Sequence, residues 1–255
     1  MTKKIVIIGS GNVATHLSIA LFKEKYEIVQ VFSRTLKSAK ILAEQVNANY
    51  TNLSENLFLH ADLYIIAVSD NSISEIVNFE ALKNKFLVHT AGSVSIDIFE
   101  NKISNYGVFY PLQTFSKNIS VNFSEVPICI EASALPYQKY LEKIAHNLGC
   151  KTYLINSLER TKLHLAAVFV NNFTNYLYST AYNILEKDNL PFEILHSLIK
   201  QTSEKAINNN PNKVQTGPAV RGDETTIKKH LKMLDSEVLY KEIYTVISKQ
   251  LDIGG

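Results

Sequence analysis

The chain has 255 residues, of which 46% are apolar and 20% are charged, a composition typical of a globular protein with ample chain for a core. Its 26 basic and 24 acidic residues leave a formal net charge of +2. That balance argues against nucleic acid as the main partner, because phosphate binding requires a strong cationic excess. Only three of the basic residues are arginine, at positions 34, 160 and 221.

The sequence gives no sign of a membrane, secretory or metal-binding protein. The apolar runs at 63–68 and 165–170 are about a third of a membrane span, so we predict no membrane partner. The N-terminus is predicted to be a strand preceded by two lysines rather than a signal peptide, so we expect a cytoplasmic location. Cys129 and Cys150 lack the spacing of a metal or redox motif, which predicts reduced thiols and no metal.

The first half of the chain alternates strand-like and helix-like patterns. Runs that are apolar on both faces, as in a parallel sheet covered on each side, predict strands at 5–8, 28–32, 63–68 and 86–89. Helical patterns lie between them at 13–25, 36–46 and 73–77. Further strands are predicted at 108–110, 127–131 and 151–155, with a covering helix at 137–147. This rhythm indicates an α/β fold with a doubly wound, mostly parallel Rossmann sheet.

From residue 157 onward the strand patterns end and only helical patterns follow. The expected helices cover 158–186, 191–206, 225–234 and 237–250, the second with a proline at its first turn. We therefore predict two domains, a Rossmann-like α/β domain over 1–156 and an all-helical domain over 157–255.

A glycine-rich loop follows the first predicted strand and begins the first helix. In this context Gly9 permits a tight turn, Gly11 lets the backbone approach a pyrophosphate, and Ala14 lets the helix pack close to the strand. The helix N-terminus supplies free N–H groups for the anion. The alternative is a glycine turn that only joins strand to helix. We predict that a dinucleotide binds here, at Gly9, Ser10, Gly11, Asn12 and Val13.

The second predicted strand ends at Ser33 and Arg34, where an NAD-specific fold usually places Asp or Glu. A hydroxyl and a planar guanidinium suit the 2′-phosphate of NADP instead. The predicted cofactor is therefore NADP. The alternative is an exposed arginine that only caps the strand.

Two further strand ends are expected at the same edge of the sheet. Ala67, Val68 and Ser69 are small enough for the backbone to lie against the cofactor, so we count them among the cofactor-binding residues. His89 ends the next strand, where a nicotinamide ring would lie. It is predicted to touch that ring or a substrate oxygen, or else to be a strand-end histidine with a satisfied hydrogen bond.

These motifs resemble a family that couples an NADP-binding Rossmann-like domain to a helical domain of unknown function. The resemblance covers nearly the whole chain and is carried by residues 9–14, 67–70, 89–93, 110–115, 164–175 and 216–223. The family is a distant relative of pyrroline-carboxylate reductase, ketopantoate reductase and the β-hydroxyacid dehydrogenases. The resemblance implies a helical domain of the phosphogluconate-dehydrogenase-like type and a homodimer formed by that domain.

The longest predicted helix carries a polar stripe on an otherwise apolar surface. At about 100° per residue, the side chains that fall within one arc are His164, Asn171, Asn175, Tyr178 and Tyr182. Either the N-terminal part of this stripe lines a cleft that faces the nicotinamide, or the stripe is a buried hydrogen-bond network at an interface. We predict catalytic roles for His164 and Asn171, a substrate contact for Asn175, and structural roles for the two tyrosines.

Reducing a carbonyl or imine requires a group that supplies a proton. The related dehydrogenases use a lysine one turn before an asparagine on the corresponding helix. That position is Ala167 or Val168 here, and Lys162 is out of register with the stripe. Either His164 takes the role of proton donor, or the protein is not such a reductase.

Two further segments are candidates for substrate binding. Arg221 is a fork-shaped donor suited to a substrate carboxylate, and Asp223 is predicted to orient it, to cap the next helix, or to do both. Gln113 is a candidate for the cleft wall. Arg160, at the head of the long helix, is expected at the surface or an interface.

We therefore predict an NADP-dependent oxidoreductase that acts on a small carbonyl or imine compound bearing a carboxylate. By resemblance it is similar to ketopantoate reductase or pyrroline-carboxylate reductase. The alternative is a non-catalytic NADP-binding sensor or interaction protein.

Overall fold

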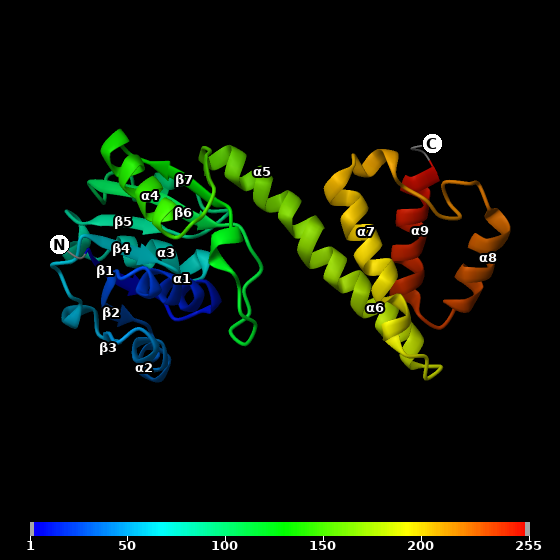
Figure 1. Ribbon diagram of the computed structural model, residues 1–255, viewed down its shortest axis with the longest axis horizontal. Helices are drawn as coiled ribbons and strands as arrows, with labels where there is room; N and C mark the ends of the chain where they lie inside the picture. Colours follow the sequence, from blue (N-terminus) through cyan, green and yellow to red (C-terminus); the bar gives the residue numbers. More distant parts are fainter. Residues whose placement is uncertain (1–2, 253–255) are drawn as a thin grey trace. The chain divides into compact units, whose positions relative to one another are not determined.

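The computed structural model describes residues 3–252, which form two compact units divided between Asn171 and Asn172 (Figure 1). The first unit contains one sheet of eight strands. All neighbouring strands are parallel except β6 and β7, which are antiparallel. In spatial order the strands are β3 (Asn49–Thr51), β2 (Glu27–Phe32), β1 (Lys4–Ile8), β4 (Leu63–Ile66), β5 (Phe86–His89), β6 (Asn105–Pro111), β7 (Ile128–Ala132) and β8 (Thr152–Leu154).

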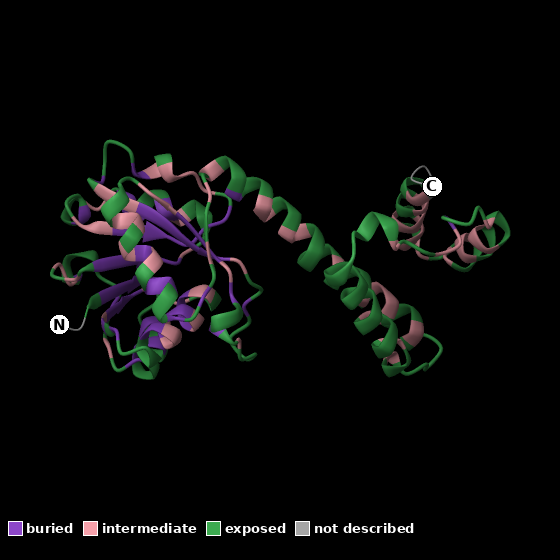
Figure 2. Ribbon diagram, turned by 45° about the horizontal axis from the view of Figure 1, so that its top comes forward, coloured by how far each residue is buried: buried purple, intermediate pink, exposed green. Residues whose placement is uncertain are grey.

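Alternate side chains of the central strand β1 belong to two separate cores, as expected for a sheet covered on both faces. Ile5 and Ile7 are buried in a cluster with Leu17 of α1, while Val6 and Ile8 are buried with Ile73 of α3. The buried residues of this unit lie mainly in the sheet (Figure 2). Its helices are α1 (Asn12–Lys23), α2 (Leu36–Gln45), α3 (Asp70–Val77), α4 (Leu135–Asn147) and α5 (Ser157–Ala167).

The second unit is helical and exposes most of its side chains. Its helices are α6 (Thr174–Glu186), α7 (His196–Asn208), α8 (Glu224–Met233) and α9 (Val238–Asp252). Among its described residues only Ala219 is buried. Figure 2 accordingly shows exposed and intermediate residues along these helices.

The predicted helix over 158–186 is helical throughout but not uniform. A π-helix, Val168–Phe173, separates α5 from α6. Each π turn takes about one residue more than an α turn, so the positions beyond it lag by roughly 100°. Spacing of about 100° per residue therefore does not apply between His164 and Asn175, and the predicted single stripe is not continuous.

Most predicted strands and helices are observed within a few residues of their expected bounds. The exceptions are β3, which had no prediction, and the segment after Pro191, where a short 3-10 helix, Phe192–Leu195, precedes α7. The domain boundary after residue 156 stays a prediction, because α5 begins at Ser157 whereas the compact units divide inside the π-helix.

Candidate functional site

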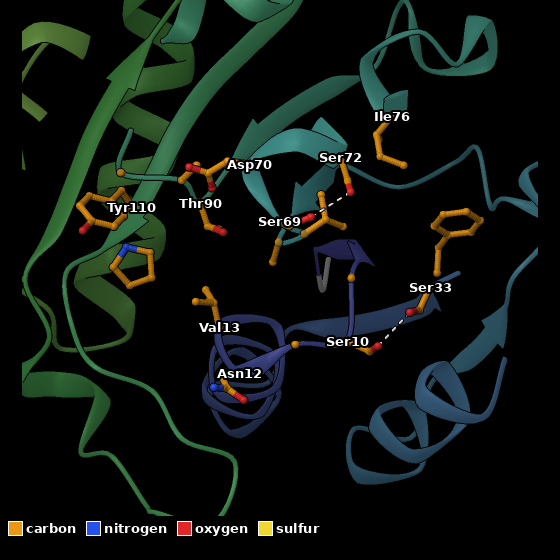
Figure 3. A pocket seen from close by; sticks show the side chains of 18 of the residues that line it. Ser10, Asn12, Val13, Ser33, Ser69, Asp70, Ser72, Ile76, Thr90 and Tyr110 are labelled. Carbon is orange, nitrogen blue, oxygen red and sulfur yellow. Dashed lines mark hydrogen bonds between the residues drawn. The ribbon is translucent and has the colours of Figure 1, made fainter. Parts of the chain in front are cut away.

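A pocket of about 610 Å³ lies at the carboxyl ends of the parallel strands. In Figure 3, Ser10 and Ser33 lie at one end of it, and Thr90 and Tyr110 lie toward the other. The pocket is thus formed where neighbouring parallel strands end together, which is the usual ligand site of open α/β sheets.

The glycine loop between β1 and α1 lines this pocket. Gly9 has φ +126°, a conformation that favours glycine, and its N–H donates to the Phe32 carbonyl at 2.8 Å. Gly11 is the N-cap of α1, and no heavy atom lies within 4 Å of the position that a Cβ would take. No side chain caps α1, so its first N–H groups are available to an anion.

Polar side chains surround the glycine loop. The hydroxyls of Ser10 and Ser33 are 2.8 Å apart, which joins the loop to the end of β2. Arg34 follows Ser33, is exposed, and lines the pocket. The Asn12 amide donates to the Phe115 carbonyl at 2.7 Å, so the start of α1 is held against the loop that follows β6.

The start of α3 forms a second polar rim. Ser69 and Ser72 have their hydroxyls 2.9 Å apart, and Asp70 accepts a short hydrogen bond from the Ser93 hydroxyl. This bond connects the start of α3 with the loop that follows β5. The acidic residues Asp70 and Glu75 and the basic residue Arg34 all line the pocket.

A histidine and a tyrosine meet at the far end of the pocket. The Tyr110 Oη and the His164 Nδ1 are 3.1 Å apart, although the residues are 54 positions apart in the chain. Burial raises the pKa of Tyr110 to about 12, so its hydroxyl keeps its proton at neutral pH. A Cβ at Gly92 would lie 2.7 Å from the His164 Nδ1 and 2.9 Å from the Tyr110 Cζ. Only glycine at position 92 leaves room for both rings.

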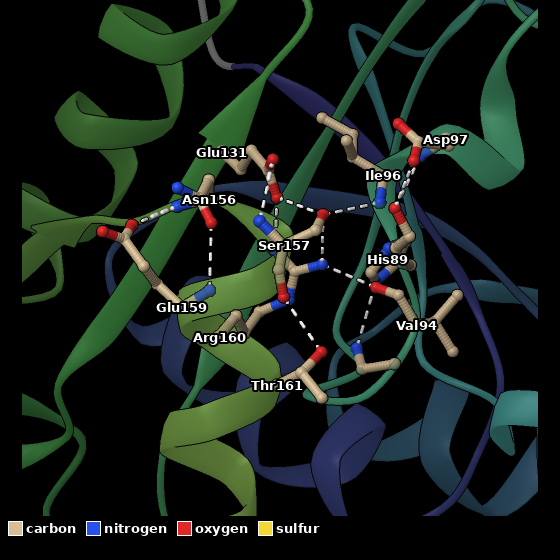
Figure 4. Close-up of polar contacts among 12 residues, drawn as sticks. His89, Val94, Ile96, Asp97, Glu131, Asn156, Ser157, Glu159, Arg160 and Thr161 are labelled. Carbon is tan, nitrogen blue, oxygen red and sulfur yellow. Dashed lines mark hydrogen bonds and ion pairs between the residues drawn. The ribbon is translucent and has the colours of Figure 1, made fainter.

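Arg160 was expected at the surface or an interface, and this prediction is wrong: the residue is 1% exposed. Its guanidinium forms a short ion pair with Glu131 and donates to the Val94 carbonyl at 2.6 Å (Figure 4). The Ser157 hydroxyl donates to Glu131 at 2.7 Å and accepts from the Ile96 N–H at 2.9 Å. The start of α5 is therefore attached both to β7 and to the loop that carries Gly92.

His89 lies inside the fold and does not line the pocket. It is 0% exposed, stacks on Phe99 with ring centroids 5.6 Å apart, and accepts from the Ala91 N–H through Nδ1 at 3.2 Å. Burial lowers its pKa to about 3, and the nearby Arg160 charge acts in the same direction. This internal histidine has a hydrogen bond at Nδ1, as the structural alternative expects, but its buried Nε2 has no hydrogen-bond partner among the described residues.

Among the remaining predicted site residues, the structure brings most into the pocket. Those that line it are Gly9, Ser10, Gly11, Asn12, Val13, Ser33, Arg34, Ala67, Val68, Ser69, Gln113 and His164. Asn171 is exposed and ends the first unit, and Asn175, Arg221 and Asp223 belong to the second unit.

Asp223 forms the N-cap of α8. Its carboxylate accepts from the Thr226 N–H at 3.0 Å and from the Thr226 hydroxyl at 2.8 Å. These two hydrogen bonds lower its pKa, as does the Arg221 charge. The capping alternative considered for Asp223 is thus realised.

Several residues that line the far end of the pocket are not among the predicted site residues, including Asp70, Gly92 and Tyr110. Asp70 and Gly92 follow strands in the same way as the residues that were identified, so their positions offered a signal. Tyr110 belongs to a segment that carries the family resemblance, but nothing local predicts its contact with His164, which lies far along the chain.

Two family profiles match the chain. Residues 4–92 match the family described as NADP oxidoreductase, coenzyme F420-dependent, and residues 126–251 match a domain of unknown function, DUF2520. The structure of BF3122 from Bacteroides fragilis, a candidate NADP oxidoreductase, is 41% identical, with 98% of each chain covered and a TM-score of 0.92. The chain belongs to the family of this oxidoreductase.

Membership of this NADP oxidoreductase family confirms the predicted resemblance, the Rossmann-like fold with a helical C-terminal region, and NADP as the coenzyme of the family. A pyrroline carboxylate reductase from Plasmodium falciparum, solved with NADP bound, shares the fold. It is 15% identical, with 98% of each chain covered and a TM-score of 0.63.

The chain also matches part of a longer curated protein. Glutamyl-tRNA reductase from Methanococcus aeolicus is 24% identical over 217 residues, which are 74% of this chain and 56% of the relative. The chain thus spans little more than half the length of that protein. Within residues 3–252, no helix has the length and apolar character needed to cross a membrane, and no cluster of three or more His, Cys, Asp or Glu could hold a metal ion.

Proposed function

We propose that this chain is an NADP-dependent reductase of a small carbonyl or imine compound bearing a carboxylate, similar to ketopantoate reductase or pyrroline-carboxylate reductase. One observation carries the proposal. A single pocket has an anion-binding helix N-terminus and Arg34 among its walls, and it also contains the paired side chains of Tyr110 and His164. A phosphate-binding end and a proton-donating end are the two features that such a reductase needs.

The residues of the pocket suit NADP. The free N–H groups at the start of α1 and the open space beside Gly11 suit the pyrophosphate. Ser33 and Arg34 suit the 2′-phosphate, since a guanidinium can form two parallel hydrogen bonds to it. Ala67, Val68 and Ser69 line the stretch between this end and the far end.

Replacing Arg34 by alanine is expected to weaken NADPH binding about 10-fold to 100-fold, because hydrogen bonds to charged groups contribute roughly 1.5–3 kcal/mol each. NADH binding should change little. Titration of both coenzymes into the wild-type and variant proteins measures this. The exposed Lys37 of α2 provides a control, because Lys37→Ala removes a nearby charge that does not line the pocket. Equal wild-type affinities for NADH and NADPH would contradict the assignment.

When bound, NADPH supplies a hydride to the substrate. The chain itself must then supply a proton, and His164 is the proposed donor, because it lines the pocket and its Nδ1 is already hydrogen-bonded to Tyr110. Gln113 is proposed to contact substrate from the pocket wall. The proposed catalytic role of Asn171 and the substrate contacts of Asn175, Arg221 and Asp223 remain predictions.

His164→Ala is expected to lower kcat about 100-fold or more, since loss of a general acid typically costs roughly 10²–10⁴ in rate. NADPH affinity should stay within about twofold of wild type, because the anion-binding residues are untouched. Steady-state kinetics and coenzyme titration separate the two effects. The matched control is His146→Ala, an exposed histidine of α4 outside the pocket. An unchanged turnover rate in the His164 variant would refute the role.

The second unit is proposed to form a homodimer. Its helices expose large apolar side chains, among them Ile194, Leu198, Ile207, Met233, Val238 and Val246. Such extensive exposure is rare on monomeric proteins and marks interaction surfaces. Light scattering should therefore give twice the chain mass of 28.7 kDa. A single-chain mass at micromolar concentration would overturn this proposal.

The reaction itself is tested by following NADPH oxidation with a panel of 2-keto acids and cyclic imines. Oxidation with one class is the expected result. The absence of a lysine at Ala167 or Val168 favours the second candidate, a sensor that binds NADPH without turnover. Tight NADPH binding with no oxidation of any compound would support that candidate. The cytoplasmic location remains a prediction.

A further inference from the structure

Tyr110 is placed to control which nitrogen of His164 faces the substrate. Its ring is nearly fully buried, and its Oη lies 3.1 Å from the His164 Nδ1, in the hydrogen-bonding range. We infer that Tyr110 is a positioning residue that occupies Nδ1 in both protonation states of His164, leaving Nε2 to exchange a proton with the substrate. This inference rests on the proposed role of His164 as proton donor.

A tyrosine hydroxyl is suited to this task because it can both donate and accept a hydrogen bond. When the neutral imidazole has its proton on Nε2, the Tyr110 O–H donates to Nδ1, and when the neutral ring has its proton on Nδ1, Nδ1–H donates to the Tyr110 oxygen. When the imidazole carries protons on both nitrogens, Nδ1–H donates to the Tyr110 oxygen. The high pKa of Tyr110, about 12, keeps the hydroxyl protonated, so both arrangements are available at neutral pH.

Packing holds the two rings in this arrangement. They meet edge to face, with centroids 6.2 Å apart and planes inclined by 70°. Gly92 lies directly against both rings, since even a single methyl group there would be closer than 3 Å to each. A 180° rotation of the imidazole about its Cβ–Cγ bond would put Cδ2 in the place of Nδ1 and so break the hydrogen bond to Tyr110.

The proton transfer balances with protons from the solvent alone. A hydronium ion gives its proton to Nε2 of the neutral imidazole, which becomes an imidazolium, and a water molecule is left. The Nε2–H bond then breaks as an O–H or N–H bond forms on the reduced substrate. The ring is then neutral, and its remaining proton, on Nδ1, is donated to the Tyr110 oxygen. The proton that left neutralises the negative charge that hydride transfer places on the substrate.

The test combines turnover with a spectroscopic measurement on the complete protein. Tyr110→Phe keeps the ring and removes only the hydroxyl. We expect kcat to fall on the order of 10-fold to 100-fold, the usual effect of removing a group that orients a catalytic residue, with the KM for NADPH within about twofold of wild type. The 15N resonance of the His164 Nδ1 should shift as well, because that nitrogen loses its partner. Thermal unfolding verifies that the variant is folded.

Tyr106→Phe is the matched control, because Tyr106 lies on β6 as Tyr110 does and does not line the pocket. It should leave both kcat and the His164 resonance unchanged. The inference is overturned if Tyr110→Phe leaves either the Nδ1 resonance or kcat at its wild-type value.

A double variant separates this inference from the proposed function. If Tyr110 acts through His164, adding Tyr110→Phe to His164→Ala causes no further loss of kcat. A further loss would show that Tyr110 acts directly and would overturn the inference. Unchanged turnover in His164→Ala alone would instead refute the proposed role of His164, and the resonance would still report whether the contact exists.

Discussion

Replacing Gly9 by alanine is expected to lower the free energy of unfolding by at least about 2 kcal/mol and to abolish detectable NADPH binding. Gly9 has φ +126°, where an L side chain is strained. The added Cβ would also overlap the Ala67 carbonyl group, with its carbon 2.7 Å away and the oxygen closer still. Because Ala67 directly follows β4, this clash cannot be relieved without moving the end of a central strand. Urea denaturation followed by circular dichroism measures the loss.

Gly11→Ala is the matched control for Gly9→Ala. It alters the same loop but is expected to weaken NADPH binding with little effect on stability. Gly11 has a φ of −76° that alanine accepts, and its Cβ would meet no atom. The unfolding free energy should therefore stay within about 1 kcal/mol of wild type. The methyl would extend into the space proposed for the pyrophosphate, at a cost of about 1–3 kcal/mol, so NADPH affinity should fall about 10-fold to 100-fold. Normal NADPH affinity in Gly11→Ala would contradict the proposed pyrophosphate position.

Arg160→Met is expected to lower the free energy of unfolding by about 3 kcal/mol, near the lower end of the range for breaking a buried ion pair. The loss arises because Glu131, whose side chain is only 17% exposed, loses the charge that compensates it. Glu131 keeps its hydrogen bonds to Ser157, which limits the loss. The Val94 carbonyl loses its donor as well, so the loop that carries Gly92 should loosen. Urea denaturation and hydrogen exchange in residues 90–96 measure the two effects.

Two further variants show whether the charge itself is responsible. Lys162→Met removes an exposed charge from the same helix and should change stability by less than about 0.5 kcal/mol. Adding Glu131→Leu to Arg160→Met removes the uncompensated carboxylate and should restore part of the stability. If the double variant is less stable than Arg160→Met alone, the unpaired charge is not the cause of the loss.

The sheet could be predicted because each central strand is determined by the apolar residues within its own short segment. Strands such as β1 and β4 are short apolar runs that are buried on both faces, and such runs are typical of the interior of a parallel sheet. β3 escaped prediction because its three residues, Asn49–Thr51, include two exposed side chains and carry no such pattern. The antiparallel pairing of β7 with β6 depends on the course of the connecting loop, which side-chain periodicity does not determine.

The candidate site could be predicted only where the residues that act together are neighbours in the sequence. The glycine loop and the Ser33–Arg34 pair each follow a strand, so their place in the pocket follows from the fold. The contact of Tyr110 with His164 and the burial of Arg160 against Glu131 join residues far apart in the chain. An arginine at the first turn of a helix has no local feature that distinguishes burial from exposure, and for that reason the prediction for Arg160 was wrong.

The attachment of α5 to the sheet determines which unit carries the proposed proton donor. The capping box of Asn156 and Glu159, the Arg160 network and every lining residue from Gly9 to His164 belong to the first unit. The side chain proposed as the proton donor is therefore held by the same compact unit as the glycine loop, through contacts that lie before Asn171 in the chain. Variants of the helices beyond Asn171 should accordingly leave the contact between His164 and Tyr110 intact.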